Sequence, residues 1–242
     1  MRSFSSDAGI ERISEVQIEA RGALLRGDLA VPSEARGIVL FAHGSGSGRR
    51  SPRNRFVARR LYELGLGTLL FDLLTQEEET IDLATSHLRF DIWLLAGRLV
   101  EATDWVASTR TTRGLPMGYF GASTGGGAAL VAAAELGEKV GAVVSRGGRP
   151  DLAAEALGRV KSPTLLIVGG LDHVVIELNR QALEQLSCEK ELRIVPGATH
   201  LFEEPGALEQ VAGLAGEWFK RHLGGRANAR VGQNERDSHV VR

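Results

Sequence analysis

Short apolar segments alternate with longer amphipathic segments along most of the chain, and this alternation limits the fold more than any other feature. Five segments are of strand length and almost wholly apolar: GIVLFAH, GLGTLLFDL, LPMGYFG, VGAVVSR and SPTLLIVGG. Such runs are typical of parallel strands that are buried on both faces. Each is followed by a segment that suits a helix, so the sequence predicts right-handed βαβ units and a mostly parallel sheet with helices on both faces.

The predicted helices have apolar residues at helical spacing, and several end at a glycine, a common helix stop. They cover residues 53–65, 89–108, 125–137, 175–186 and 207–223. Ahead of them, EVQIEARGALLRGDLAVP has the partial alternation of an antiparallel hairpin that turns near Arg21-Gly22. Between Arg146 and Thr164 there is room for one short helix, so we expect no large cap domain.

The length and composition of the chain suit one globular domain. With 242 residues, of which 43% are apolar, the chain can form a single large core. We expect this domain to span residues 15–223, with residues 1–14 as a leader and residues 224–242, rich in Arg, Asn and Gly, as a disordered tail. No apolar run approaches the ~20 residues of a membrane span, and no secretory signal is evident. We therefore expect a cytoplasmic protein.

The charge and cysteine content argue against several classes of partner. The 29 basic and 30 acidic residues give a net charge of -1, so we expect neither nucleic acid nor a membrane surface as a partner. The single cysteine, Cys188, excludes an intramolecular disulfide framework and a cysteine-rich zinc site. The sequence leaves open whether the protein forms a homodimer.

The segment MGYFGASTGGGAAL places Ser123 between an apolar strand and a small-residue helix. This is the context of a nucleophile elbow, in which glycines at 121 and 125 allow strand and helix to pass closely. The serine would project at the carboxyl edge of the sheet, beside the positive end of the helix dipole. The alternative is an ordinary glycine-rich turn, since the chain contains 30 glycines.

A serine nucleophile needs a base and an orienting carboxylate, in the order Ser, Asp, His in this arrangement. TLLIVGGLDHVV supplies Asp172 after one buried strand, and ELRIVPGATHLFEE supplies His200 after the next. Both loops lie at the carboxyl edge, where ligands bind in open α/β sheets. We predict a Ser123-His200-Asp172 triad with Ser123 Oγ near His200 Nε2, although Asp172 could instead cap a helix and His200 could be a surface residue.

Backbone N–H groups near Ser123 could form an oxyanion hole. The N–H of Thr124, at the start of the helix, is the first expected donor, and the N–H of Ser45, in the glycine loop FAHGSGSGRR, is the second. Gly44 and His43 precede that donor and are candidate substrate contacts. For His43, bracing of the loop by hydrogen bonds is the favoured interpretation.

Taken together, HGSGSG, FDLLT, GASTGGG, GGLD and GATHLF resemble, in sequence and order, the landmarks of the dienelactone hydrolase-like group of α/β-hydrolases over residues 15–223. The resemblance implies an α/β-hydrolase fold. Dienelactone hydrolases use a cysteine nucleophile, whereas position 123 is serine, which favours ordinary carboxylic esters. HGSGSGRRSPRNRF also resembles hydrolases labelled or fused with phosphoribosyltransferases, but FDLLTQEEET lacks the small-residue phosphate loop of such an enzyme.

Charged residues gather at the same predicted edge. Arginine binds carboxylates in a bidentate manner, so Arg146, in VVSRGG, is the best candidate to bind an anionic substrate. Surface solubility or pairing with the acidic run Glu77–Glu79, interpreted as a solvated turn, is the alternative. Asp72 is expected to fix a loop. The other arginines near this edge are Arg49, Arg50, Arg53, Arg55 and Arg149.

We therefore predict a serine esterase that needs no metal or organic cofactor and acts on small-molecule esters. Its pocket should be shallow and open and favour short acyl groups, with the loop from Thr75 to Arg89 as a partial lid. Two alternatives stay open: a thioesterase, lactonase or acyltransferase with the same triad, and a non-catalytic ligand-binding protein of this fold.

Overall fold

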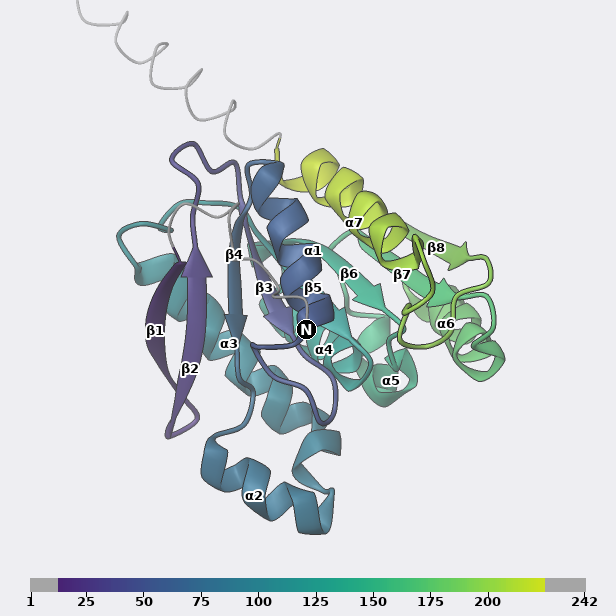
Figure 1. Ribbon diagram of the computed structural model, residues 1–242, viewed down its shortest axis with the longest axis horizontal. Helices are drawn as coiled ribbons and strands as arrows, with labels where there is room; N and C mark the ends of the chain where they lie inside the picture. The colour runs from purple at the N-terminus through teal and green to yellow at the C-terminus, as the bar shows by residue number, and fades with distance from the viewer. Residues whose placement is uncertain (1–12, 225–242) are drawn as a thin grey trace, which may run out of the picture.

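One twisted sheet of eight strands runs through the protein in the order β1-β2-β4-β3-β5-β6-β7-β8 (Figure 1). The computed structural model describes residues 13–224. From β4 to β8 every neighbouring pair is parallel, whereas β2 is antiparallel to both β1 and β4. The strands are β1 (Ile13–Ala20), β2 (Ala23–Ala30), β3 (Ile38–Ala42), β4 (Gly67–Phe71), β5 (Met117–Ala122), β6 (Val140–Arg146), β7 (Thr164–Gly169) and β8 (Lys190–Val195).

The N-terminal hairpin turns at Arg21 and Gly22, as the sequence indicates. Their φ angles are +52° and +71°, and two successive positive values are typical of a tight two-residue hairpin turn. β1 begins at Ile13, two residues before the expected start of the domain. The rest of the expected leader, and all of the expected tail beyond residue 224, lie outside the described residues.

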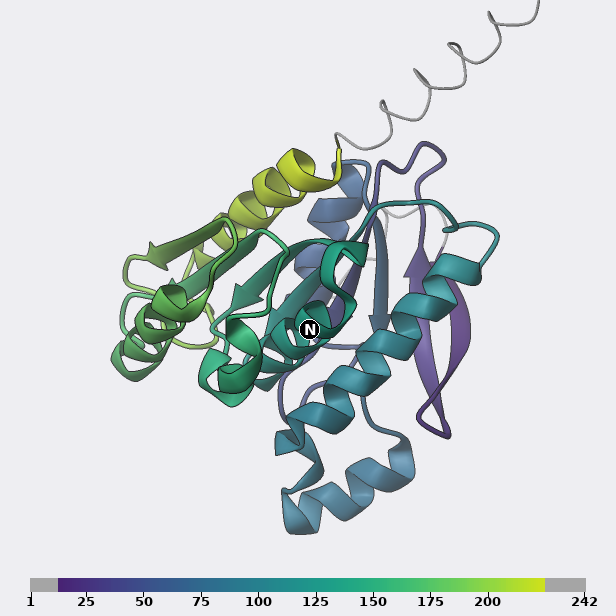
Figure 2. The ribbon, with the colours of Figure 1, turned by 180° about the vertical axis from the view of Figure 1, so that it is seen from behind.

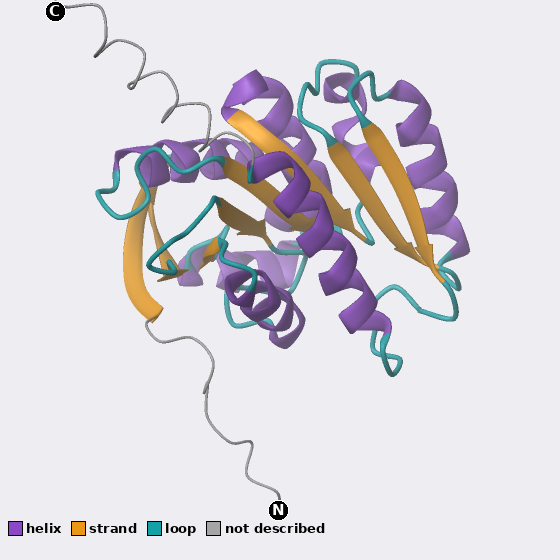
Figure 3. Ribbon diagram, turned by 90° about the horizontal axis from the view of Figure 1, so that it is seen from above, coloured by secondary structure: helices purple, strands orange, loops and turns teal. Residues whose placement is uncertain are grey.

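Helices cover both faces of the sheet (Figures 2 and 3). On one face α1 and α7 pack against apolar residues such as Phe41 and Phe120. On the other face α3 and α4 pack against Leu40 and Tyr119. The helices are α1 (Pro52–Glu63), α2 (Gln76–Thr85), α3 (Ile92–Ser108), α4 (Thr124–Leu136), α5 (Ala154–Leu157), α6 (His173–Gln185) and α7 (Ala207–Leu223). Within residues 13–224, no helix is both long enough and apolar enough to cross a membrane.

This arrangement confirms the predicted α/β-hydrolase fold, with its mostly parallel sheet and antiparallel N-terminal strands. Only a short 3₁₀ turn (Pro150–Ala153) and α5 lie between β6 and β7, so no cap domain is inserted there. Because the sheet is covered on both faces, its central strands are almost completely buried, as the continuous apolar runs require.

The segment expected to be a loop from Thr75 to Arg89 is instead mostly helix. Thr75 and Glu78 form a capping box at the start of α2, each side chain binding the backbone N–H of the other. Glu78 also binds Arg98, which is only 2% exposed on α3. The interpretation of Glu77–Glu79 as a solvated turn is therefore wrong for Glu78, because its carboxylate anchors α2 to the domain.

Candidate active site

Ser123 lies at the turn between β5 and α4 in a backbone conformation that is unusual for a residue with a side chain. Its φ is +52° and its ψ is −122°, outside the regions that hard-sphere contacts allow for L-residues. The flanking glycines let strand and helix meet there. A Cβ on Gly121 would lie 2.5 Å from the oxygen of Gly125, and one on Gly125 would lie 2.1 Å from the oxygen of Ala42. No larger residue fits either position.

The loop after β6 holds the turn in place. The N–H of Ser123 donates to the oxygen of Arg146 (3.2 Å), and the oxygen of Ser123 accepts from the N–H of Arg149 (3.0 Å). Gly126 and Gly127 permit this contact, since a Cβ on either would lie within 3 Å of this loop or of Ser145. This role of the loop was not predicted, although the three consecutive glycines at 125–127 are a sign of close packing.

His200 and Asp172 form a hydrogen-bonded pair at the carboxyl edge. His200 Nδ1 donates to Asp172 Oδ2 over 2.6 Å. Asp172 occupies the N-cap position of α6, yet its side chain makes no capping hydrogen bond, so its carboxylate serves the histidine rather than the helix. The imidazole packs near Gly147, next to the loop that holds Ser123: a Cβ added there would lie 3.4 Å from His200 Cε1.

The hydrogen bond expected between Ser123 Oγ and His200 Nε2 is absent from the described residues. Among the described residues, Ser123 Oγ has no hydrogen bond to His200, whose side chain is 38% exposed. In sites without substrate such contacts are often long and shorten only in the reacting complex. The structure therefore brings the serine, histidine and aspartate to one edge but forms only one of the two hydrogen bonds of a triad.

The glycine loop after β3 lies directly beside Ser123. Gly44 contacts it so closely that an added Cβ would lie 3.0 Å from Ser123 Cβ. The next residue, Ser45, shares a 3.2 Å hydrogen bond between its hydroxyl and that of Thr124. Thr124 is the first residue of α4, where the backbone N–H groups have no helical partner. Both expected donor residues thus flank the serine.

A buried arginine fixes the end of this loop. Arg49 is 6% exposed and its guanidinium contacts the carboxylates of Glu15, Asp28 and Asp72. Asp72 also accepts a 2.8 Å hydrogen bond from the backbone N–H of Arg49. Asp72 has the contacts expected of a loop-fixing carboxylate. Within residues 13–224 the hydrogen-bonded partners of Arg49 are these three carboxylates, and none of them belongs to the acidic run 77–79.

His43 also holds this loop in place, through hydrogen bonds of both ring nitrogens. Its Nδ1 donates to the oxygen of Gly44 (3.0 Å), and its Nε2 accepts from the N–H of Leu73 (2.8 Å). Burial lowers the pKa of His43, so the ring is neutral and its tautomer is fixed by these two partners. Because both ring nitrogens are occupied, neither is left for a substrate atom.

A pocket of about 370 Å³ opens beside the two expected oxyanion donors. Its wall on the far side is α2, which lies beyond the carboxyl edge of the sheet in Figure 1. The segment considered a partial lid is therefore a well-anchored helix that forms one wall of this pocket. The lining includes Ser45, Ser47, Arg50, Leu74, Glu79, Asp82, Leu83, Arg89, Leu95 and Thr124.

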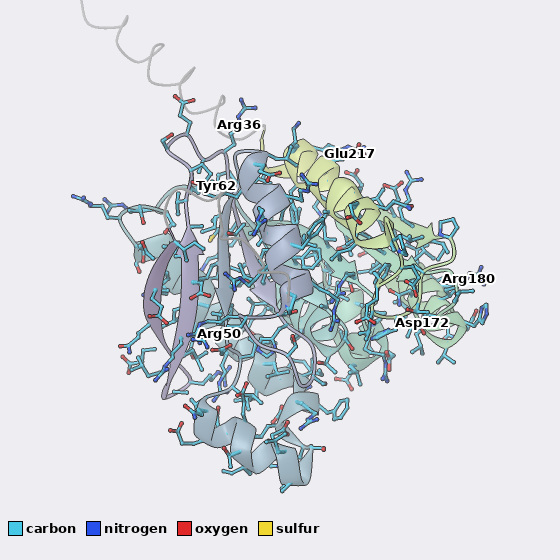
Figure 4. All side chains as sticks on the ribbon, viewed as in Figure 1. Arg36, Arg50, Tyr62, Asp172, Arg180 and Glu217 are labelled. Carbon is cyan, nitrogen blue, oxygen red and sulfur yellow. The ribbon has the colours of Figure 1, made fainter. Side chains whose placement is uncertain are left out.

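The arginines near the site have different partners. Arg53 pairs with Glu203 and Arg149 with Asp151. Arg50 lines the pocket, and Figure 4 places it toward β2 whereas Asp172 lies toward α6. Arg146 is buried at the end of β6.

The chain is similar in sequence to a known protein family and to longer curated proteins. The model described as the dienelactone hydrolase family matches residues 25–222. Two curated proteins of Mycobacterium tuberculosis, one from strain CDC 1551 / Oshkosh and one from strain ATCC 25618 / H37Rv, are 59% identical over 214 residues. Both are named "Putative phosphoribosyl transferase". The match covers 88% of this chain but 47% of each relative, so the chain spans about half their length.

Solved structures resemble the chain over nearly its whole described part. A dienelactone hydrolase from Anabaena variabilis ATCC 29413 is 64% identical with a TM-score of 0.86, covering 88% of this chain and 98% of its own. Est1E from Butyrivibrio proteoclasticus is 16% identical with a TM-score of 0.73, covering 86% and 98% respectively. At that identity the likeness shows the shared fold alone.

Proposed function

The chain belongs to the dienelactone hydrolase family, and on that basis we propose that it is a serine hydrolase that cleaves small carboxylic esters through an acyl-enzyme. The observation that carries this proposal is the strained turn at Ser123, held beside a hydrogen-bonded His200-Asp172 pair. Strained backbone of this kind occurs mainly where function requires it.

The reaction would begin with attack of Ser123 Oγ on the ester carbonyl carbon while His200 Nε2 accepts the hydroxyl proton. Asp172 supports this step, because its hydrogen bond to Nδ1 selects the tautomer with a free Nε2 and stabilises the imidazolium that forms. His200 then gives the proton to the leaving alcohol as the ester C–O bond breaks. Water, deprotonated by the same ring, then attacks the acyl carbon. The bond between this carbon and Ser123 Oγ breaks, His200 returns the proton to Oγ, and the carboxylic acid leaves.

Two features support an oxyanion hole formed by the N–H groups of Thr124 and Ser45. Thr124 is at the positive end of α4, and the hydroxyls of the two residues are hydrogen bonded to each other. Removal of one oxyanion donor typically costs about 3 to 4 kcal/mol of transition-state stabilisation. The contacts of Arg49 and His43 would hold the Ser45 loop in place before the substrate binds.

The pocket favours the acyl group as its occupant. It lies on the oxyanion side of Ser123, and Leu74, Leu83 and Leu95 supply apolar surface within it. We therefore extend the expected range of acyl groups from the shortest chains to those of several carbons.

The curated relatives that are named as transferases are about twice as long as the segment that matches this chain. A phosphate would need positive charge, such as that of a free helix N-terminus. The first turn of α2, which follows Asp72, instead carries Glu77, Glu78 and Glu79. This acidic turn argues against a phosphoribosyl site there, and the transfer chemistry does not form part of our proposal.

The direct test measures hydrolysis of 4-nitrophenyl acetate and 4-nitrophenyl butyrate by the wild type and Ser123→Ala. We expect turnover that the substitution abolishes, and labelling of Ser123 by a fluorophosphonate probe. Turnover that survives in Ser123→Ala, or a label on another residue, would contradict the proposal. Adding lactones and thioesters to the panel separates the related reactions, and absence of both turnover and labelling would favour a ligand-binding protein.

A further inference from the structure

Arg146 is a buried cation without a hydrogen-bonded partner. It ends β6, is 7% exposed, and makes no side-chain hydrogen bond or ion pair within residues 13–224. Its Nε and Nη1 are fully enclosed, and Nη2 is the one guanidinium nitrogen that is not. The other arginines nearby differ in this respect: Arg49, Arg53 and Arg149 each bind a carboxylate.

The surroundings of Arg146 do not neutralise it. Its guanidinium carbon lies 5.7 Å from the centroid of the Phe202 ring. Burial, together with the smaller effect of the positive charge of Arg53, lowers the pKa of Arg146 to about 10. Neither carboxylate of the His200 loop binds Arg146: Glu203 binds Arg53, and Glu204 binds Thr199 through Oε1 while its buried Oε2 has no hydrogen-bond partner among the described residues.

A guanidinium in this state is unfavourable without a counter-ion. A buried charge is normally paired, because the loss of hydration is large and only a nearby opposite charge offsets it. Arginine is always charged at neutral pH and offers donors in a planar fork that matches carboxylate and phosphate. The enclosed side of Arg146 is packed, so an anion could reach it only at Nη2.

The position of Arg146 relative to Ser123 indicates which part of a substrate could reach it. Its backbone oxygen accepts from the N–H of Ser123, and the following residue, Gly147, lies beside the His200 ring, since an added Cβ would be 3.4 Å from His200 Cε1. Phe202, against which the guanidinium packs, is in the His200 loop. Arg146 thus lies on the histidine side of the serine, whereas the pocket of about 370 Å³ lies on the oxyanion side.

We propose that Arg146 binds an oxyanionic group, a carboxylate or a phosphate, on the alcohol portion of the ester. This rests on the proposed function, in which His200 protonates the leaving oxygen and the alcohol therefore departs along the histidine side. The acyl group occupies the pocket beside Ser45 and Thr124, and the anionic alcohol extends past His200 to Nη2 of Arg146. The substrate class is an ester of an anionic alcohol.

The test compares 4-acetoxybenzoate, whose leaving alcohol is anionic, with its neutral methyl ester. In Arg146→Met the ratio of kcat/KM for the anionic ester to that for the neutral ester should fall about 10- to 100-fold, the range for loss of a hydrogen bond to a charged group. Arg146→Lys should restore part of the ratio. Arg149→Met is the matched control, because Asp151 is the one hydrogen-bonded partner of its side chain in the part of the chain that the structure describes, and it should leave the ratio unchanged.

Two outcomes would overturn the proposal. If both esters lose activity equally in Arg146→Met, the residue only positions the His200 loop through Phe202. If the loss instead appears with mono-4-nitrophenyl succinate relative to 4-nitrophenyl butyrate, the anion is recognised on the acyl side.

A binding measurement separates failure of this proposal from failure of the esterase assignment. In the Ser123→Ala background, calorimetry with 4-hydroxybenzoate and 4-hydroxyphenyl phosphate needs no turnover and compares the two kinds of anion. Weaker binding of either one on adding Arg146→Met, with no change for methyl 4-hydroxybenzoate, supports the site. Equal binding with and without Arg146 refutes it, whatever the hydrolysis assays show.

Discussion

Replacement of Ser123 by glycine should give a more stable protein than replacement by alanine. Both variants remove the hydroxyl, so they do not differ in the nucleophile. They differ in the backbone, because alanine keeps the Cβ that makes φ +52°, ψ −122° unfavourable, whereas glycine adopts such angles freely.

The size of the difference follows from two opposing effects. Backbone strain of this kind costs about 1 to 3 kcal/mol, which glycine relieves. Glycine also loses more conformational freedom on folding, at a cost of about 0.5 to 1 kcal/mol. With the middle of each range, about 2 and about 0.75 kcal/mol, the net advantage of glycine in the free energy of unfolding is about 1.25 kcal/mol. For a domain of this size, that corresponds to about 2 to 5 °C in Tm.

The assay is urea unfolding followed by circular dichroism, with thermal unfolding as a second measure. Ser145 supplies the matched control, because it lies inside β6 and does not have a positive φ. There the order should reverse, with alanine more stable than glycine by about 0.5 to 1 kcal/mol. If alanine equals or exceeds glycine at 123 while the control behaves as expected, the turn does not carry the strain that we infer.

Three further substitutions test the supports of the site. Gly125→Ala should lower the free energy of unfolding by about 3 kcal/mol, because its Cβ would lie 2.1 Å from a backbone oxygen of β3. Its control is Gly213→Ala in α7, where an added Cβ would have nothing within 4 Å and should raise the free energy of unfolding by about 1 kcal/mol. Asp72→Asn should lower the free energy of unfolding by about 1 to 3 kcal/mol and should also lower kcat. Its control is Glu15→Gln, which removes a 71% exposed partner of the same arginine and should lower the free energy of unfolding by under about 1 kcal/mol. Burial lowers the pKa of His43 in the folded protein, so the unfolded chain is protonated at a higher pH and stability falls as the pH drops through about 6.5. The stability cost of His43→Gln, measured by urea unfolding, should therefore be smaller at pH 5 than at pH 7. An equal cost at both pH values would contradict this prediction.

The sequence predicted the features whose signals are local. The strands appear as continuous apolar runs, and the turn at Ser123 is marked by glycines at fixed offsets on both sides. Asp172 and His200 were identified because each directly follows a strand of the sheet. Their hydrogen bond joins residues 28 positions apart, and strand order was enough to anticipate that they would be close.

Other features depend on contacts that no local pattern reveals. α2 was missed because Asp82 is its one buried residue, so it lacks the apolar stripe that marks a helix. What keeps it in place is Arg98, which lies outside the segment. The unpaired state of Arg146 likewise depends on a distant pairing, because Glu203 in the His200 loop binds Arg53, 150 positions earlier in the chain.

The anchoring of α2 separates selectivity from chemistry in this fold. Arg98 holds the start of the helix through Glu78, and Arg89 holds its second half through Asp82. Leu83, next to Asp82, is exposed and lines the pocket. Neither anchor touches the turn at Ser123 or the His200-Asp172 pair. Substitutions along this wall would therefore change which acyl groups are accepted while the reacting residues stay unaltered. Acyl-group preference can thus evolve, or be engineered, separately from the reaction itself.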